Sequence, residues 1–252
     1  MKKMFSAVAV MLLAMGTGFG QEKPGTIASL QFQTPKNGMV KQYEDGRKQK
    51  AAWHKQQKDT LPLMVFETLS GEHTGTYIVG RFEQHWADFD KPSVSEEADR
   101  DEFNKVIGAA VESRVSRYYR LLVKDSKPPE SKTPSKYSEV LTYRLRSGKG
   151  QQFHAAITRV NEAIEKTKWP AHYFWYTLAN GGSGGTYVLV IPHENWADFD
   201  DKPNMKPFPE MLTEAFGSAE AESIMARLDE ATESETSEIV QFRPDLSYLL
   251  TK

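Results

Sequence analysis

The chain has 252 residues, a formal net charge of −2 at pH 7 and no cysteine. This length suits one large domain or two small ones. The near-neutral charge and the lack of a long basic stripe argue against nucleic acid as a partner. The lack of cysteine excludes disulfides and a thiol nucleophile, so we expect buried apolar surface to stabilise the fold.

The first twenty residues have the pattern of a secretory signal peptide. Two early lysines precede the apolar run Phe5–Met15, which is too short to span a bilayer. Gly18 and Gly20 supply the small residues expected before a cleavage site. We therefore expect residues 1–20 to be removed, leaving a soluble periplasmic or secreted protein with no membrane contact.

A short phrase occurs twice in the chain, as HWADFD at His85–Asp90 and as NWADFD at Asn195–Asp200. Gly75–Ile78 and Gly185–Val188 repeat at the same spacing. Such self-similarity predicts a tandem duplication. A stretch rich in proline, serine and lysine lies between the copies and is typical of an extended spacer. The predicted boundaries are a first repeat over 21–125, a linker over 126–136 and a second repeat over 137–252.

In chain order, the first copy shows the patterns of a strand, a helix, two strands, a helix and a strand. Runs rich in aromatic and β-branched residues predict its strands. Apolar residues at helical spacing predict its two helices, the first from a thin stripe and the second from a fuller one. The strands are predicted at 29–34, 63–69, 76–82 and 118–123, and the helical stripes are Val40, Tyr43 and Trp53, then Phe103, Val106, Ile107, Ala110 and Val111.

The second copy repeats this order with stronger patterns. Its strands are predicted at 139–145, 173–178, 186–191 and 238–242. A glycine-rich hairpin, NGGSGG, joins the middle two strands and opens no helix, which argues against a phosphate loop. The two helical stripes are Phe153, Ala156, Ile157, Val160, Ala163 and Ile164, then Met211, Leu212, Ala215, Ile224, Met225 and Leu228.

The order β-α-β-β-α-β is the ferredoxin-like split arrangement, so the sequence predicts an α+β fold of two tandem units. Helices should cover one face of each four-stranded sheet. Along the predicted strand 186–191, Tyr187 and Leu189 fall on one face and Val188 and Val190 on the other. A strand with one wet face would alternate apolar and polar residues. We therefore expect the sheet of the sister copy to cover the second face.

The repeated strand order and the tryptophan just after each third strand resemble the dimeric α/β-barrel superfamily of ferredoxin-like domains. This superfamily includes antibiotic-biosynthesis-type monooxygenases and NIPSNAP-like proteins. The resemblance covers nearly the whole mature chain and implies two sheets packed as a pseudo-dimeric α/β barrel. It permits a cofactor-independent oxygenase or a haem-handling enzyme, but a shared fold does not fix an activity.

The repeated phrase has a functional and a structural interpretation. Its aspartates could bind a cation or act as acid–base groups, but a calcium loop needs more oxygen ligands and a characteristic glycine. Turn and cap chemistry explains every residue type present, and we favour it. The interpretation predicts buried tryptophans that pin each corner, and aspartates that accept hydrogen bonds from backbone N–H groups. The residues concerned are Trp86, Asp88, Asp90, Trp196, Asp198 and Asp200.

No histidine is duplicated between the copies. His85 aligns with Asn195, and His193 aligns with Glu83. No spacing of histidine, cysteine and carboxylate residues resembles a zinc motif, so we expect no metal and assign no cofactor. A single asymmetric site in one copy stays open, with His172 and His193 as its first candidates because they flank the aromatic strands of the second copy.

Aromatic enrichment is the most distinctive functional signal. Most of these rings are expected to pack in the core. Between two sheets, aromatics and a few polar groups can also line a ligand site. The sequence therefore favours non-catalytic binding of a small apolar or aromatic ligand, or of a protein partner, by a monomer or weak homo-oligomer. The candidate ligand-binding residues are Glu67, Thr68, His172, Trp175, Tyr176, Thr177 and His193.

Overall fold

The computed structural model describes residues 24–131, 133–200 and 205–250. The predicted signal peptide lies outside the described residues, and export stays a prediction. Within the described ranges, no helix is both long enough and apolar enough to cross a membrane.

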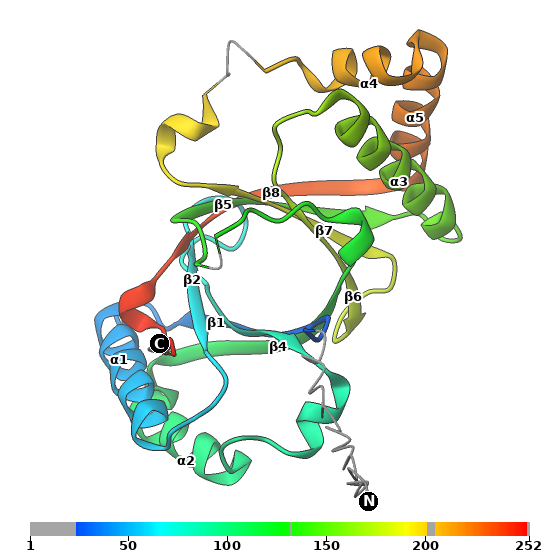
Figure 1. Cartoon of the computed structure of the whole chain (residues 1–252). Helices are drawn as coiled ribbons and strands as arrows, with labels where there is room; N and C mark the ends of the chain where they lie inside the picture. Colours follow the sequence, from blue (N-terminus) through cyan, green and yellow to red (C-terminus); the bar gives the residue numbers. More distant parts are fainter. Residues whose placement is uncertain (1–23, 132, 201–204, 251–252) are drawn as a thin grey trace, which may run out of the picture.

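The first repeat has the predicted order of elements (Figure 1). Four strands and two helices are joined by short 3-10 turns at Trp86–Asp90 and Gly108–Ala110. A further 3-10 turn, Val123–Asp125, leads into the linker. The elements are β1 (Ile27–Pro35), α1 (Val40–Gln56), β2 (Met64–Thr68), β3 (Tyr77–Gln84), α2 (Glu96–Val106) and β4 (Val111–Leu121).

The second repeat follows the same order with one extra helix. The phrase NWADFD again forms a 3-10 turn, Trp196–Phe199, and a further 3-10 turn, Pro244–Leu246, follows the last strand. The elements are β5 (Tyr137–Leu145), α3 (Gly150–Thr167), β6 (Phe174–Asn180), β7 (Thr186–His193), α4 (Phe208–Phe216), α5 (Ser218–Ala231) and β8 (Thr232–Phe242).

Three sequence predictions about these elements are wrong. The second helix of the first repeat ends at Val106, so the last three residues of its predicted stripe, Ile107, Ala110 and Val111, lie outside it. The last strand of each repeat begins earlier than predicted, because its polar first half pairs with β1 or β5 while both of its faces remain open to solvent. The second stripe of the second repeat is two helices, α4 and α5. They are divided by Gly217, whose φ of 82° lies in a region that glycine adopts readily and other residues rarely adopt.

The eight strands close into one barrel, in the order β1-β3-β2-β8-β5-β7-β6-β4. Every neighbouring pair is antiparallel, and the pairs β2–β8 and β4–β6 join the two repeats. Each strand lies four places along this ring from the corresponding strand of the other repeat, as β1 does from β5. The two corresponding strands run in the same direction. A half-turn about the barrel axis therefore relates the repeats, and the prediction that the sheets face one another is confirmed.

The helices lie outside the barrel, on opposite sides of it (Figure 1). Because of the half-turn symmetry, the hairpins after β2 and β6 lie at one end of the barrel. The turns Trp86–Asp90 and Trp196–Phe199 lie at the other end. Each sheet thus has an outer face against helices and an inner face toward the barrel axis, as expected for this arrangement.

Candidate functional site

The side chains that face the barrel axis form an apolar group, which we call the interior cluster. The rings of Phe66 and Phe242 extend it, with centroids 5.4 Å apart. The cluster itself comprises the buried residues Ala28, Tyr119 and Val188 and the partly buried Leu30, Phe32, Phe82, Val140, Tyr176, Leu178 and Val190 packed on them.

The partly buried members of the interior cluster keep some solvent-accessible surface. Because the strands pair all the way round, solvent reaches the inside of the barrel only through its two ends. An eight-stranded barrel is either filled by its own side chains or holds one small ligand. Partial exposure of apolar groups that point inward therefore shows that solvent reaches part of the inner wall.

The inner wall carries hydroxyl side chains, among them Thr142 and Thr236, and a few larger polar groups. Burial raises the pKa of the Tyr176 phenol, so its hydroxyl stays protonated at neutral pH and can donate a hydrogen bond. Arg117 on β4 pairs with Leu30, and Glu238 on β8 pairs with Val140, so both charged side chains share the inward face of their partners.

Glu238 is held by the hairpin that follows β2. Its Oε1 accepts a hydrogen bond from the backbone N–H of His73 at 3.2 Å and lies 2.6 Å from Nδ1 of that imidazole. The Glu238 side chain is 15% exposed, whereas His73 is 60% exposed. The pair places a carboxylate and an imidazole at one end of the barrel, where they could exchange a proton with a bound molecule.

The structure divides the predicted ligand-binding residues between the two faces of the sheets. Only Tyr176 belongs to the interior cluster. Trp175 is buried against the helices of the second repeat, and Oε2 of Glu67 accepts a hydrogen bond from Nη1 of Arg243 at 2.6 Å. The others are dispersed: Thr68 is buried, Thr177 bonds the carbonyl of Thr186, His172 is exposed near the carbonyl of Pro128, and His193 stacks on Phe199.

The interiors of the helix layers do not fit a haem. Between α3, α4, α5 and their sheet, side chains such as Phe153 and Met211 are at most 1% exposed and fill the layer. The corresponding layer of the first repeat contains His54, which is 1% exposed and engaged by carboxylates. Among the described residues, no group of three or more histidine and acidic side chains could hold a metal ion.

The duplicated phrase forms a structural corner, but one of its predicted features is wrong. Trp86 is 46% exposed and Trp196 is 53% exposed, so neither is largely buried. Each packs one ring face on neighbouring aromatics, with the Trp196 centroid 4.7 Å from that of Tyr137. The reason is that the 3-10 turn lies at the barrel rim, where only one side of the indole meets protein.

Of the four aspartates expected to accept backbone hydrogen bonds, Asp88 and Asp198 do so, and among the described residues no such bond reaches Asp90 or Asp200. Oδ2 of Asp88 accepts a hydrogen bond from the backbone N–H of His85 at 2.7 Å. Oδ2 of Asp198 accepts one from the backbone N–H of Glu194 at 2.8 Å. Both turns therefore have the reciprocal capping arrangement that satisfies backbone groups at the start of a turn.

A buried ionic network in the first repeat was not predicted. Nδ1 of His54 lies 2.8 Å from Asp59, whose carboxylate also accepts hydrogen bonds from Arg81 at 2.7 Å and from Ser93. On the other side, Nε2 of His54 lies 3.4 Å from Asp99. Burial alone would raise the pKa of the Asp59 carboxyl, but these hydrogen bonds hold it well below its usual value. The network joins α1 and α2 to the sheet, so we assign it a structural role.

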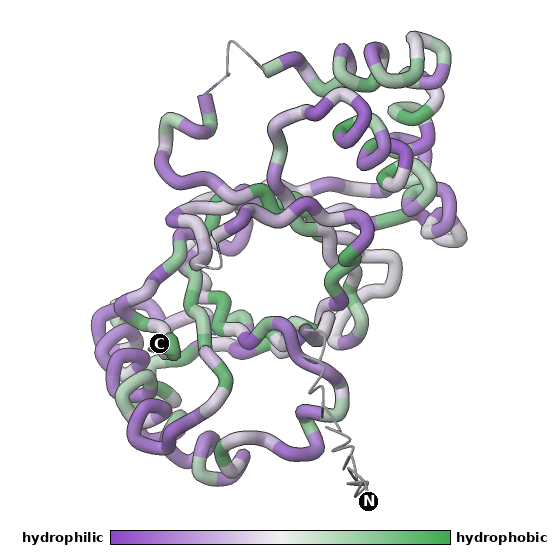
Figure 2. Tube along the Cα trace, in the orientation of Figure 1, coloured by the Kyte–Doolittle hydropathy of each residue, from purple (hydrophilic) through white to green (hydrophobic). Residues whose placement is uncertain are grey.

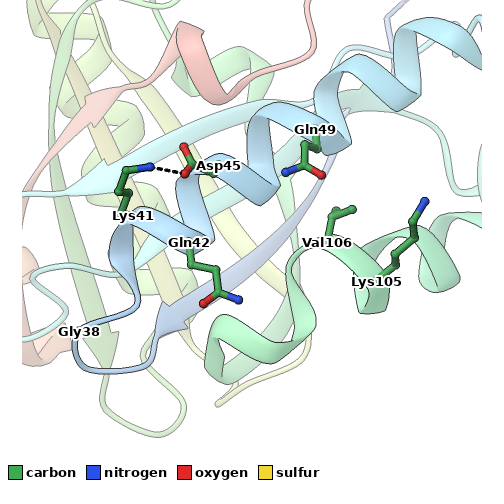
Figure 3. A pocket seen from close by; sticks show the side chains of 7 residues that line it. All are labelled: Gly38, Lys41, Gln42, Asp45, Gln49, Lys105 and Val106. Atoms are coloured by element: carbon green, nitrogen blue, oxygen red, sulfur yellow. Dashed lines mark hydrogen bonds and ion pairs between the residues drawn. The ribbon is translucent and has the colours of Figure 1, made fainter.

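Two hollows on the outer surface are lined mostly by residues with polar side chains. One, of about 620 Å³, lies between α1 and the end of α2, and includes the ion pair of Lys41 and Asp45 (Figure 3). The other, of about 480 Å³, lies beside α3 and includes His154 and the buried Asp125. Neither collects the aromatic groups of the chain, which places the barrel interior ahead of them as a site for an apolar ligand.

Comparison with known proteins supports the fold and nothing finer. No family model and no curated protein matches the sequence. A Lactobacillus acidophilus protein solved under the provisional name of monooxygenase matches with a TM-score of 0.53 and 8% identity, over 88% of this chain and 95% of that chain. A Fusobacterium nucleatum protein with the same provisional name matches with a TM-score of 0.54 and 12% identity, over 87% and 93%.

A haem-binding protein from Thermus thermophilus is less similar, with a TM-score of 0.47 and 10% identity over 88% of this chain and 92% of that chain. That similarity is too slight to support an inference about haem. The eight-stranded antiparallel barrel and the two better matches agree with the resemblance found in the sequence. The chain has the fold of the dimeric α/β-barrel superfamily, with both halves of the barrel in one polypeptide.

Proposed function

We propose that the barrel interior binds a small aromatic or apolar molecule. The observation that carries this proposal is the partial exposure of the interior cluster inside a closed barrel. Aromatic and aliphatic walls with a few convergent polar groups are typical of small-molecule sites. Phe32 and Tyr176 supply ring faces, and the Tyr176 hydroxyl supplies a donor.

Of the two activities open to such a site, we propose cofactor-independent oxygenation rather than binding alone. The support is the fold shared with two proteins solved under the provisional name of monooxygenase. In this chemistry, removal of a proton from a hydroxylated aromatic substrate gives an anion that reacts with O2 to form a hydroperoxide. Loss of water from the hydroperoxide leaves a quinone, so one oxygen atom enters the product and the other leaves as water. The Glu238 carboxylate on the inner wall, paired with His73 at the barrel end, is an acid–base group available for this step.

Binding can be tested with the fluorescent probes 1-naphthoate and 1-naphthylmethanol, titrated with the mature chain. We expect at least one probe to bind with saturable fluorescence anisotropy. Val190→Phe enlarges an inward side chain and should weaken that binding at least tenfold. Leu189→Phe enlarges the adjacent residue of β7, which faces the helices, and should change the affinity for the probe by less than threefold. Equal effects of the two variants, or no binding of either probe, would contradict an interior site.

Oxygenation can be tested by oxygen uptake with hydroxynaphthalenes, without added metal or flavin. We expect uptake that depends on the protein and falls at least tenfold in Glu238→Gln, while the affinity for 1-naphthylmethanol stays within threefold. If none of the hydroxynaphthalenes causes oxygen uptake while the probes still bind, the protein binds a ligand but is not an oxygenase.

We also propose that the chain is exported, as the pattern of residues 1–20 predicts. Cell fractionation of the full chain should place it in the periplasm or the medium with a new N-terminus near residue 21. A variant that lacks residues 2–20 should stay in the cytoplasm. Recovery of an uncut full chain in the cytoplasm would contradict export.

A further inference from the structure

We propose that Arg117 recognises an anionic group on the ligand, so that the barrel is selective for aromatic molecules that carry a carboxylate. The inference rests on the proposed interior site and adds the chemical class of its ligand. It depends on the geometry of Arg117, on the hairpin above it and on a comparison with the equivalent place in the second repeat.

Arg117 reaches into an aromatic and aliphatic environment. Its guanidinium lies over the ring of Phe32, with the central carbon 5.1 Å from the ring centroid. Its Nε is buried and makes no hydrogen bond with the described residues, and no carboxylate among them is ion-paired with it. A buried N–H donor without an acceptor is costly, and an anion bound at this Nε would remove that cost.

The hairpin after β6 brings only small groups near the guanidinium. Gly181, at a φ of 91°, lies so close to β4 that a Cβ would be 2.5 Å from the carbonyl oxygen of Ser116. A Cβ at Gly182 would be 3.7 Å from Nε of Arg117. The hairpin sequence NGGSGG contains no acidic residue. The fold therefore covers one side of the guanidinium without neutralising it.

The equivalent side chain in the other half of the barrel already has a partner. Arg117 is the seventh residue of β4, and Glu238 is the seventh residue of β8. The strands are four places apart in the ring, so the two side chains stand on opposite walls. Glu238 has His73 from its hairpin, whereas Arg117 has no such partner among the described residues. Arg117 is therefore the member of the two that can pair with an anionic group of a ligand.

The chemistry of the two groups fixes the ligand class. A guanidinium presents parallel N–H donors that match a carboxylate better than a single-point anion. The ring beneath it and the rest of the interior cluster favour an aromatic or apolar body. Glu238 on the opposite wall disfavours a second negative charge there. The expected ligand is an aromatic monoacid.

The experiment compares two probes that differ in one group. 1-Naphthoate is anionic and 1-naphthylmethanol is neutral, with the same ring system. We expect the wild-type chain to bind the naphthoate at least tenfold more tightly, and Arg117→Met to abolish that preference without weakening the neutral probe. Arg114→Met is the matched control, because Arg114 lies on the same strand over Phe103 on the outer face. It should keep the preference.

The outcomes separate this inference from the proposed site. If both probes bind equally and Arg117→Met changes neither, the interior site stands and the anion preference is wrong. If neither probe binds the wild-type chain, the interior site fails, and the inference falls with it. Where Arg117→Met does not fold, Arg117→Lys keeps the charge but loses the planar fork and should reduce the preference at least threefold. Glu238→Gln should tighten naphthoate binding, and a weakening would count against the inference.

Discussion

In the first repeat, α1 is held to the rest of the molecule by buried Lys50 and His54, which contact carboxylates including that of Asp59. In the second repeat, the equivalent helix, α3, is held by apolar side chains such as Phe153 and Ile157. Figure 2 shows the same contrast, because the trace of α1 is largely hydrophilic and that of α3 has more hydrophobic positions.

A single pair of positions makes the difference concrete. Tyr43 and Phe153 are each the fourth residue of their helix, and each ring lies near a tyrosine of the third strand, at 4.7 Å from Tyr77 and 5.0 Å from Tyr187. The Tyr43 hydroxyl donates a hydrogen bond to Gln33 at 2.8 Å. The same β-α-β-β-α-β backbone can thus have either a polar or an apolar layer between its first helix and its sheet, provided that every buried polar group has a hydrogen-bond partner.

The largest expected effect is in the apolar layer. Phe153→Ala removes a ring that is 1% exposed and should lower the free energy of unfolding by about 3–5 kcal/mol, the range for large aromatic truncations in cores. Tyr43→Phe is the counterpart in the polar layer and should cost about 1 kcal/mol, because it removes one hydrogen bond and little volume. Urea unfolding measures both, and similar losses would break the contrast between the layers.

The next largest effect is in the ionic network. Asp59→Asn leaves His54 and Arg81 without their buried carboxylate and should lower the free energy of unfolding by about 3 kcal/mol. Because the pKa of Asp59 is lowered in the folded state, its contribution is present above the unfolded value of about 4 and is lost as the pH falls below it. Melting temperatures between pH 6 and pH 3 should therefore fall more steeply in the wild type than in Asp59→Asn. Parallel curves would show that the network does not respond to acid.

A smaller effect is expected at the barrel rim, where the repeats agree. Trp196→Ala should cost about 2 kcal/mol, because roughly half of the ring is already in water. Trp175→Ala, at a position that is 6% exposed, provides the comparison and should cost more. Thermal unfolding of the two variants measures the difference, and an equal loss would mean that the Trp196 corner carries more of the fold than its exposure indicates.

The smallest expected effect tests the caps. Asp198→Ala and Asp88→Ala should each cost about 1 kcal/mol, because each removes a carboxylate that accepts a backbone hydrogen bond in the same turn. The two losses should agree within about 0.5 kcal/mol by chemical denaturation. A marked inequality would show that the two corners differ as much as the two helix layers do.

The sequence was a good guide to the order of elements and to the facing sheets. Apolar residues on both faces of the 186–191 stretch required a second cover, and the barrel supplies it. The early starts of β4 and β8 were missed because Val111–Arg117 and Thr232–Ser237 lack the apolar alternation of a strand. These segments are strands because their backbones pair with β1 and β5, and sequence alone does not reveal that pairing.

The ionic network and the inner charges were harder to find from sequence. Arg47, Lys50 and His54 continue the helical stripe of Tyr43, but charged residues at those positions are normally taken as solvent-exposed. The spacing itself was the available signal. Arg117 and Glu238 lie beside the polar first halves of their strands, and only the register with Leu30 and Val140 shows that they point inward.

The half-turn that relates the repeats has a consequence for stoichiometry. A barrel closed by two identical chains must present every inward side chain twice, so any site away from the axis is duplicated. Here the chain is continuous, and the seventh positions of β4 and β8 have diverged to Arg117 and Glu238. The barrel therefore has a positive wall and a negative wall. If the barrel binds a charged ligand as proposed, that ligand has one binding position and one orientation, and saturation should come at one ligand per chain.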